Sequence, residues 1–151
     1  MLNRIYYTLQ HILVMRLLLQ YQFNNWQNLH DLLFLASAES LERHDLGFYD
    51  FIRTNSNVYS PILRQVVREL IAAGVVDEKH LALTPRGREI YYSLGSILRP
   101  YDDFCRRIEK IVERLGHDVR KTGRAVRSNI AYHRAKRGKH IFPEGDKPFF
   151  R

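Results

Sequence analysis

Apolar positions follow a helical period along most of the chain, and polar breaks separate the helices that they predict. Over residues 2–23 they surround much of a helical wheel, which is typical of a helix buried on two sides. After a polar break at 24–25, an apolar stripe predicts a second helix over 28–43, with Asn28 as its N-cap. Aromatic residues then dominate 48–52, which we interpret as a short helix before a polar loop.

The most clearly marked helix begins at Ser60 and Pro61. The Ser60 hydroxyl is suited to accept a hydrogen bond from the first N–H groups of the helix, and Pro61 has no N–H that needs a partner. Gly74 ends this helix, and its apolar residues recur on one face. The sequence therefore predicts an amphipathic helix that presents polar side chains to solvent.

A hairpin and two further helices follow. A polar reversal between two short apolar runs predicts a two-stranded hairpin over 75–83. Thr84 and Pro85 repeat the helix-start chemistry, and the helix that they begin ends before Pro100. Over 101–115, apolar residues recur at coiled-coil-like spacing. This seam predicts either a dimer contact or packing against the first helix of the same chain.

The order of these elements is the layout of a winged helix, in which one helix enters a DNA major groove and the hairpin lies along the backbone. We expect a mainly α fold: a winged helix-turn-helix with a short β-hairpin, extra N- and C-terminal helices and a basic tail. Asp77 and Glu78 at the hairpin tip disfavour phosphate contact, so a winged helix that binds protein stays open. For DNA, we place Thr54, Asn55, Asn57 and Tyr59 beside phosphates and Ser60, Ile62, Arg64, Gln65 and Arg68 on the groove side.

The net charge lies in the last 33 residues. Residues 119–151 contain ten Lys or Arg against two acidic residues, whereas residues 1–118 contain fourteen of each. We therefore divide the chain into a winged-helix body at 1–118 and a basic C-terminal extension at 119–151. A basic block of this kind binds polyanions, of which nucleic acid is the most abundant in a cell. The cations expected to contact phosphates are Arg120, Lys121, Arg124, Arg127, Arg134, Lys136, Arg137 and Lys139.

The extension carries the pattern of one weakly amphipathic helix over 119–136. Gly123 and the unpaired charges disfavour this helix in isolation, so we expect it to order on its partner. Tyr132 and His133 lie among the cations and also allow base stacking. We rank DNA ahead of RNA as the partner, with single strands, structured RNA or a ribosome-associated role as alternatives. A homodimer and a protein partner also stay open.

Four short motifs between about residues 29 and 94 resemble winged-helix proteins of bacteria and phages. Residues 83–89 read Leu-Thr-Pro-Arg-Gly-Arg-Glu. This helix start is similar to one that recurs in transcription regulators of the multiple-antibiotic-resistance and phenolic-acid-regulator families. Residues 32–36 and 59–63 resemble the Panacea antitoxin domain, whose members neutralise a partner toxin by direct contact. Together with Ala-Gly-Val-Val at 73–76, these motifs imply a winged-helix fold that serves transcription regulation or protein binding.

No catalytic, metal-binding or cofactor-binding motif is recognisable in the sequence. The seven His residues, Cys105 and the carboxylates lack ligand spacing, and no Gly-rich loop suited to a phosphate occurs. We therefore expect neither enzymatic activity nor a cofactor. Cys105 lies in an apolar seam, where a buried thiol is expected, and a single cysteine fits a reducing, cytoplasmic compartment. Polar residues interrupt the N-terminal apolar segment, so we expect no membrane association.

Overall fold

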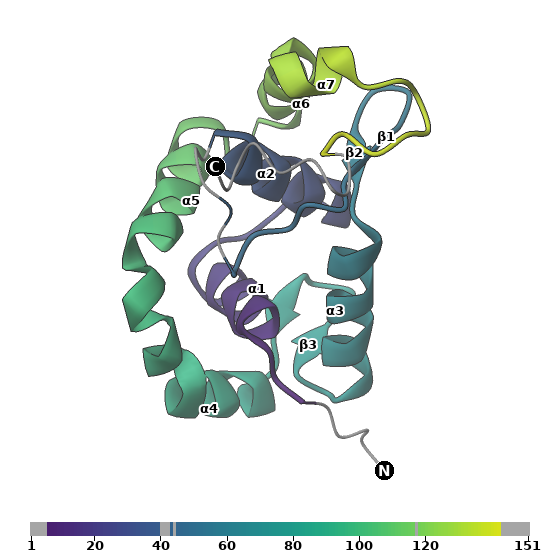
Figure 1. The fold of residues 1–151 in the computed structure, drawn as a ribbon. Coiled ribbons are helices and arrows are strands. Elements are labelled where there is room, and N and C mark those ends of the chain that lie inside the picture. The colour runs from purple at the N-terminus through teal and green to yellow at the C-terminus, as the bar shows by residue number, and fades with distance from the viewer. Residues whose placement is uncertain (1–5, 40–42, 44, 117, 143–151) are drawn as a thin grey trace.

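The computed structural model describes residues 6–39, 43, 45–116 and 118–142, and Figure 1 shows how its elements are arranged. The first half of the chain forms α1 (Leu9–Gln20), α2 (Trp26–Glu39), β1 (Ile52–Arg53), β2 (Val58–Tyr59) and α3 (Pro61–Ala72). The second half forms β3 (Val76–Asp77), β4 (Ala82–Leu83), α4 (Pro85–Leu94), the 3-10 helix η1 (Gly95–Tyr101), α5 (Asp102–Leu115), α6 (Val119–Ser128) and α7 (Ile130–Arg134).

The fold is mainly helical, as the sequence predicts, and it also contains two small antiparallel sheets. Strands β3 and β4 pair with Val76 opposite Leu83, which confirms the hairpin expected over 75–83. Strands β1 and β2 form a second hairpin, in which Ile52 lies opposite Tyr59. The short helix expected over 48–52 is wrong, because this stretch is extended and its end pairs as β1.

The starts of α3 and α4 follow the predicted cap chemistry. Ser60 is the N-cap of α3, and its hydroxyl accepts a hydrogen bond from the Leu63 N–H at 2.9 Å. Thr84 caps α4 in the same way. The expected N-cap of α2 is wrong: the Asn25 side chain accepts from the Asn28 N–H at 2.8 Å, and Asn28 itself is buried inside the helix. The boundary moved because either asparagine can supply the same acceptor.

Helices α1 and α2 form the centre of the core. The stretch from Asn28 to Ser37 in α2 is buried without interruption, as expected for a helix that is covered on all sides. Helix α5 packs its apolar seam against α2, with Phe104, Cys105, Ile108, Ile111, Val112 and Leu115 buried. This seam is therefore covered inside the chain, mainly by α2 and not by the first helix against which we expected it to pack. Among the described residues, none of the helices is both long enough and apolar enough to span a membrane.

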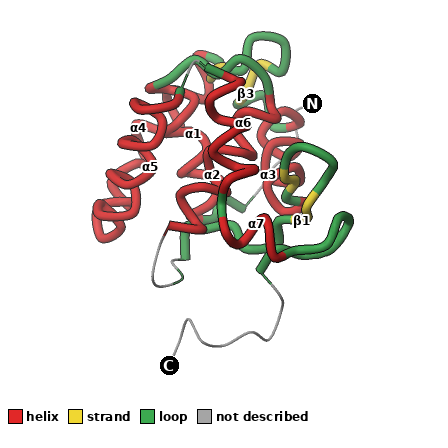
Figure 2. Tube along the Cα trace, turned by 90° about the horizontal axis from the view of Figure 1, so that it is seen from above, coloured by secondary structure: helices red, strands yellow, loops and turns green. Residues whose placement is uncertain are grey.

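The basic segment folds onto the body as two helices, where we expected one weak helix ordered by a partner. Figure 2 shows α7 beside β1, and α6 packs on α2. Helix α6 has Asp118 as its N-cap and buries Thr122, Gly123 and Val126, which recur at helical spacing on one face. Its charged residues occupy the opposite face, so the helix is strongly amphipathic.

Arg53 connects the β1–β2 hairpin to the end of α7. Its Nη1 donates hydrogen bonds to the carbonyl oxygens of Tyr132 at 3.1 Å and Ala135 at 2.8 Å. Its guanidinium carbon lies 4.3 Å from the centroid of the Tyr132 ring, a cation–π contact. The Tyr132 hydroxyl in turn donates to the Thr54 carbonyl oxygen at 3.2 Å. A positive group thus binds the exposed carbonyls at the helix C-terminus, where it is electrostatically favoured.

Main-chain hydrogen bonds extend this contact along β1. The Arg53 N–H donates to the Lys139 carbonyl oxygen at 3.0 Å, and the Gly138 N–H donates to the Arg53 carbonyl oxygen at 2.7 Å. Ile141 and Phe142 follow and are buried in the core. Residues 119–142 therefore pack on the body that we expected to end at residue 118, and the rest of the expected extension, 143–151, lies outside the described residues.

We expect Arg53→Met to lower the free energy of unfolding by about 2 kcal/mol, because it removes two charge-assisted hydrogen bonds and a cation–π contact. Urea unfolding followed by circular dichroism measures this change. Arg99→Met is the matched control, since Arg99 is exposed on η1, and it should shift the free energy by less than about 0.5 kcal/mol. Equal stabilities of the two variants would contradict the role assigned to Arg53.

Candidate nucleic-acid interface

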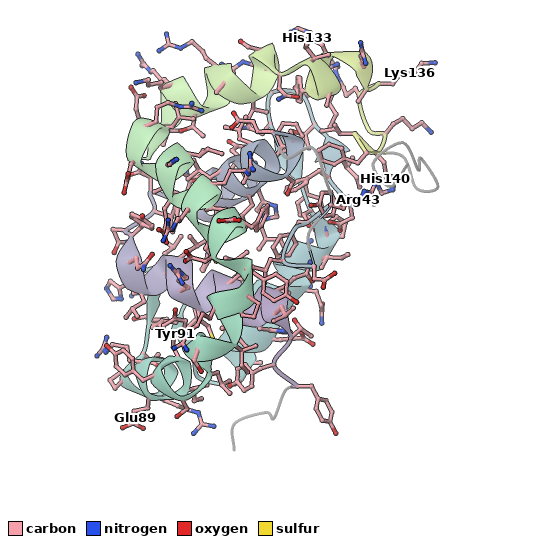
Figure 3. The ribbon with its side chains drawn as sticks, turned by 60° about the vertical axis from the view of Figure 1, so that its left-hand side comes forward. Arg43, Glu89, Tyr91, His133, Lys136 and His140 are labelled. Carbon is pink, nitrogen blue, oxygen red and sulfur yellow. The ribbon has the colours of Figure 1, made fainter. Side chains whose placement is uncertain are left out.

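The eight cations expected to contact phosphates are all exposed on one folded unit, residues 119–142, which we call the basic cap. No acidic residue occurs within it. Figure 3 shows His133 and Lys136 at the edge of the molecule formed by α6 and α7, pointing away from the body, with Glu89 of α4 at the opposite end. Helix α6 carries Arg120, Lys121, Arg124 and Arg127, α7 carries Arg134, and the segment after it carries Lys136, Arg137 and Lys139.

Helix α6 sets a regular spacing for part of this charge. Arg120, Arg124 and Arg127 are separated by four and three residues, so they follow one face of the helix. With a rise of 1.5 Å per residue, the first and last of their Cα atoms lie about 10 Å apart along the axis. One strand of duplex DNA advances about 3.4 Å per phosphate, so this row of arginines is as long as about three phosphate steps.

The β1–β2 hairpin lies between the basic cap and α3. On one side, Arg127 Nη1 donates to the Ser56 carbonyl oxygen at 3.3 Å. On the other side, Arg64 Nη1 of α3 donates to the Tyr59 hydroxyl at 3.1 Å. Ser56 and Tyr59 are three residues apart, so their Cα atoms lie within about 11 Å of each other. The cations of the basic cap and those of α3 therefore flank the same short hairpin. In Figure 1, α3 runs downward from this hairpin and α6 and α7 lie above it.

Four of the five residues expected on the groove side of α3 are exposed: Ile62, Arg64, Gln65 and Arg68. The expected exposure of Ser60 on the groove side is wrong, because this residue is fully buried. Its hydroxyl donates to Asp50 Oδ1 at 2.6 Å, while the Ile62 N–H donates to Asp50 Oδ2 at 2.7 Å. A carboxylate of the protein itself thus occupies the N-terminus of α3, where an anion would otherwise bind.

A cleft of about 700 Å³ opens within the basic cap, between α7 and the segment that follows it. Ile141 and Phe142 form part of its apolar lining. Its polar lining consists of Asn129, the cations Arg134, Lys136 and Lys139, and the imidazole of His140. Cations at an apolar cleft are suited to phosphates with attached planar groups.

The hairpin β3–β4 carries two carboxylates at its turn, and the one on Asp77 is hydrogen-bonded within the turn. Asp77 accepts hydrogen bonds from the Lys79 N–H at 3.0 Å and from His80 Nδ1 at 2.7 Å. The hydrogen bond from His80 is the main reason that the pKa of Asp77 is lowered. This carboxylate therefore closes the turn of the hairpin, and Glu78 is exposed beside it.

Two buried titratable groups on α2 hold the hairpin and α3 in place. His30 Nδ1 accepts a hydrogen bond from the Ser60 N–H at 3.0 Å, and burial lowers the pKa of His30 to about 4. Asp31 accepts hydrogen bonds from Gln27 and from Asn57, the latter at 2.8 Å, while burial raises the pKa of Asp31 to about 6. Neither role is predictable from the sequence, because both residues are polar positions outside the apolar stripe of the helix.

Comparison of the chain with family models, with curated proteins and with solved structures finds no match. Within the described ranges, no group of three or more His, Cys, Asp and Glu side chains is placed to hold a metal ion. Cys105 is buried, as its place in the seam predicts, and burial raises the pKa of its thiol. The candidate site therefore consists of the basic cap, the β1–β2 hairpin and the exposed face of α3.

Asp31→Asn should change how stability depends on pH. Between pH 4 and 6 folded Asp31 holds a proton that the unfolded chain releases, so its contribution to stability falls as pH rises. Folded His30 lacks a proton that the unfolded chain binds, so its contribution rises over nearly the same range. The variant removes the first contribution alone. The free energy of unfolding should therefore rise more steeply than in the wild type, by up to about 1.4 kcal/mol per pH unit.

Urea unfolding at several pH values measures this slope. Glu113→Gln, which removes an exposed carboxylate from α5, is the control and should follow the wild-type curve closely. If the Asp31 and Glu113 variants show the same pH dependence, the account of the buried pair is wrong.

Proposed function

We propose that this chain is a nucleic-acid-binding protein that uses the basic cap to neutralise phosphates. The observation that carries the proposal is the placement of eight exposed cations, with no acid between them, on a unit that is packed against the rest of the fold. Phosphate contacts supply most of the affinity of proteins for nucleic acids and depend little on base sequence. The cap supplies this kind of contact.

The folded state of the cap supports the proposal in a second way. A disordered basic arm loses conformational entropy when it binds, and that loss reduces its affinity. Here α6 is capped by Asp118 and buried on one face, and α7 is joined to β1 through Arg53 and Tyr132. The cations therefore stand on an ordered scaffold before any ligand is present, and less binding energy is spent on ordering.

Helix α3 supports a finer form of this proposal, a winged-helix regulator that binds duplex DNA. Arg64, Gln65 and Arg68 are exposed on α3, and Arg and Gln side chains are suited to paired hydrogen bonds with guanine and adenine. Hairpin β3–β4 follows α3, as a wing does. The β1–β2 hairpin between α2 and α3 is an addition to that layout, and it joins α3 to the basic cap.

Binding to duplex DNA should weaken steeply with salt. If all eight cations meet phosphates, the logarithm of the affinity falls with the logarithm of salt concentration at a slope of about −7. Replacing Arg120, Arg124 and Arg127 by Gln removes three cations from the exposed face of α6. The magnitude of the slope should then drop by about 3. Fluorescence anisotropy with a labelled duplex at several salt concentrations measures both values.

The matched control replaces Arg99, Arg106 and Lys110 by Gln, an equal change in net charge on η1 and α5. Its slope should stay close to that of the wild type, because these residues lie outside the basic cap. Salt-insensitive binding, or an equal loss in both triple variants, would count against the cap as the phosphate-binding surface. A protein companion that stays bound at high salt, with no affinity for nucleic acid, would support an antitoxin or adaptor role instead.

A further inference from the structure

A second pocket of about 350 Å³ lies between α2 and α3, beside the β1–β2 hairpin. This volume is near the lower end of the range for small-molecule sites. Val67 and Ile71 of α3 contribute an apolar wall, and the aromatic residues Trp26, His30 and Tyr59 line it from α2 and β2. The pocket is separate from the cleft of the basic cap, with which it shares no lining residue.

The aromatic side chains offer planar surfaces for stacking. The His30 and Tyr59 rings are stacked, with centroids 5.4 Å apart and planes inclined by 23°. Trp26 is half-buried and lines the same pocket. Proteins bind bases of any sequence by stacking them on such rings, because every base has a π-face.

His30, which lines this pocket, also carries a hydrogen-bond donor. Its Nδ1 accepts from the Ser60 N–H, so the hydrogen of the neutral ring is on Nε2. His30 is only 8% exposed, and its Nε2 has no hydrogen-bond partner in the part of the chain that the structure describes. Since burial holds the pKa of His30 near 4, the ring stays a neutral donor at the pH of a cell. A ring nitrogen or carbonyl oxygen of a base matches this donor.

The opening of the pocket is cationic. Arg64 and Arg68 line it from successive turns of α3, and both are exposed. Glu78 is the single carboxylate among the described residues that line the pocket. A ligand that fits both parts has a planar aromatic ring for the interior and a negative charge for the opening.

We infer that this pocket binds one unpaired nucleotide, with its base stacked among Trp26, His30 and Tyr59 and its phosphate on Arg64 and Arg68. The inference rests on the proposed function, since it names the part of a nucleic acid that α3 would hold. The β1–β2 hairpin carries Tyr59 into this pocket and Ser56 against Arg127 of the basic cap. A strand whose phosphates lie on the cap is thereby positioned to place a free base in the pocket.

Trp26 allows a direct test, because it is the only tryptophan of the chain. The probes are adenosine 5′-monophosphate, adenosine and ribose 5-phosphate, added to the full-length protein at low salt. We expect the monophosphate to quench the Trp26 emission saturably, adenosine to do so more weakly and ribose 5-phosphate to have no effect. Free N-acetyltryptophanamide, titrated in parallel, corrects for absorption and collisional quenching by the nucleotide.

Three variants separate the two halves of the proposed site. Arg68→Gln should weaken the monophosphate about tenfold and leave adenosine unchanged. Tyr59→Leu should weaken both about tenfold or more, whereas Tyr59→Phe should retain adenosine binding because its ring is kept. Glu78→Gln should strengthen the monophosphate, since it removes a like charge from the opening. Circular dichroism melting confirms that each variant is folded.

The inference is overturned if the monophosphate does not quench saturably, if ribose 5-phosphate binds as tightly, or if Arg68→Gln has no effect. Arg124→Gln on α6 tells this failure apart from failure of the proposed function. It should leave the monophosphate titration unchanged and reduce affinity for a long oligonucleotide. If the oligonucleotide binds with a steep salt dependence while the monophosphate does not bind, the basic cap stands and the pocket is not a nucleotide site.

Discussion

The Arg53 guanidinium binds the carbonyl oxygens of Tyr132 and Ala135, which are 79 and 82 residues further along the chain, and it fixes the end of α7 that leads to the last three cations of the basic cap. It binds the last carbonyls of α7 and packs on the Tyr132 ring, while the main chain of Arg53 pairs with residues 138 and 139. The buried Tyr132 ring, its hydrogen bond to the Thr54 carbonyl oxygen and the buried residues Ile141 and Phe142 complete the attachment of α7 and the segment after it. An internal arginine therefore helps to set how the cations of α7 and the following segment are displayed.

The β1–β2 hairpin connects the basic cap to α3. Arg53 lies on the first strand of the hairpin and binds the end of α7. At the turn, the Ser56 carbonyl oxygen accepts a hydrogen bond from Arg127 of the cap. On the second strand, the Tyr59 hydroxyl accepts one from Arg64 of α3. Behind it, His30 and Asp31 of α2 hold Ser60 and Asn57 through hydrogen bonds made in a buried setting. Breaking such a hydrogen bond costs free energy, because the buried donor or acceptor that is left over has no water molecule to bind instead. The cations of the cap and the exposed face of α3 are thus fixed relative to one short element.

The sequence predicted the features whose signals are local. The caps of α3 and α4, the hairpin β3–β4 and the apolar seam of α5 follow from residues within a turn or two of each other, and the structure confirms them. The exposure of the C-terminal cations was likewise predictable from composition. The Arg53 contacts, the pairing of β1 and the burial of Ser60 depend on residues that meet only in the folded chain. A charged residue in a polar segment gives no sign of a partner about 80 positions away, so the segment was interpreted as a tail.

The central claim is that the basic cap is folded before it meets nucleic acid. Hydrogen exchange of the amides of α6 and α7 in the free, full-length protein tests this claim most directly. Amides with intrahelical hydrogen bonds should exchange far more slowly than in an unstructured peptide. This protection should already be present in the free protein and should not depend on a bound duplex. Exchange at unstructured rates in the free protein, with protection only in the complex, would contradict the account.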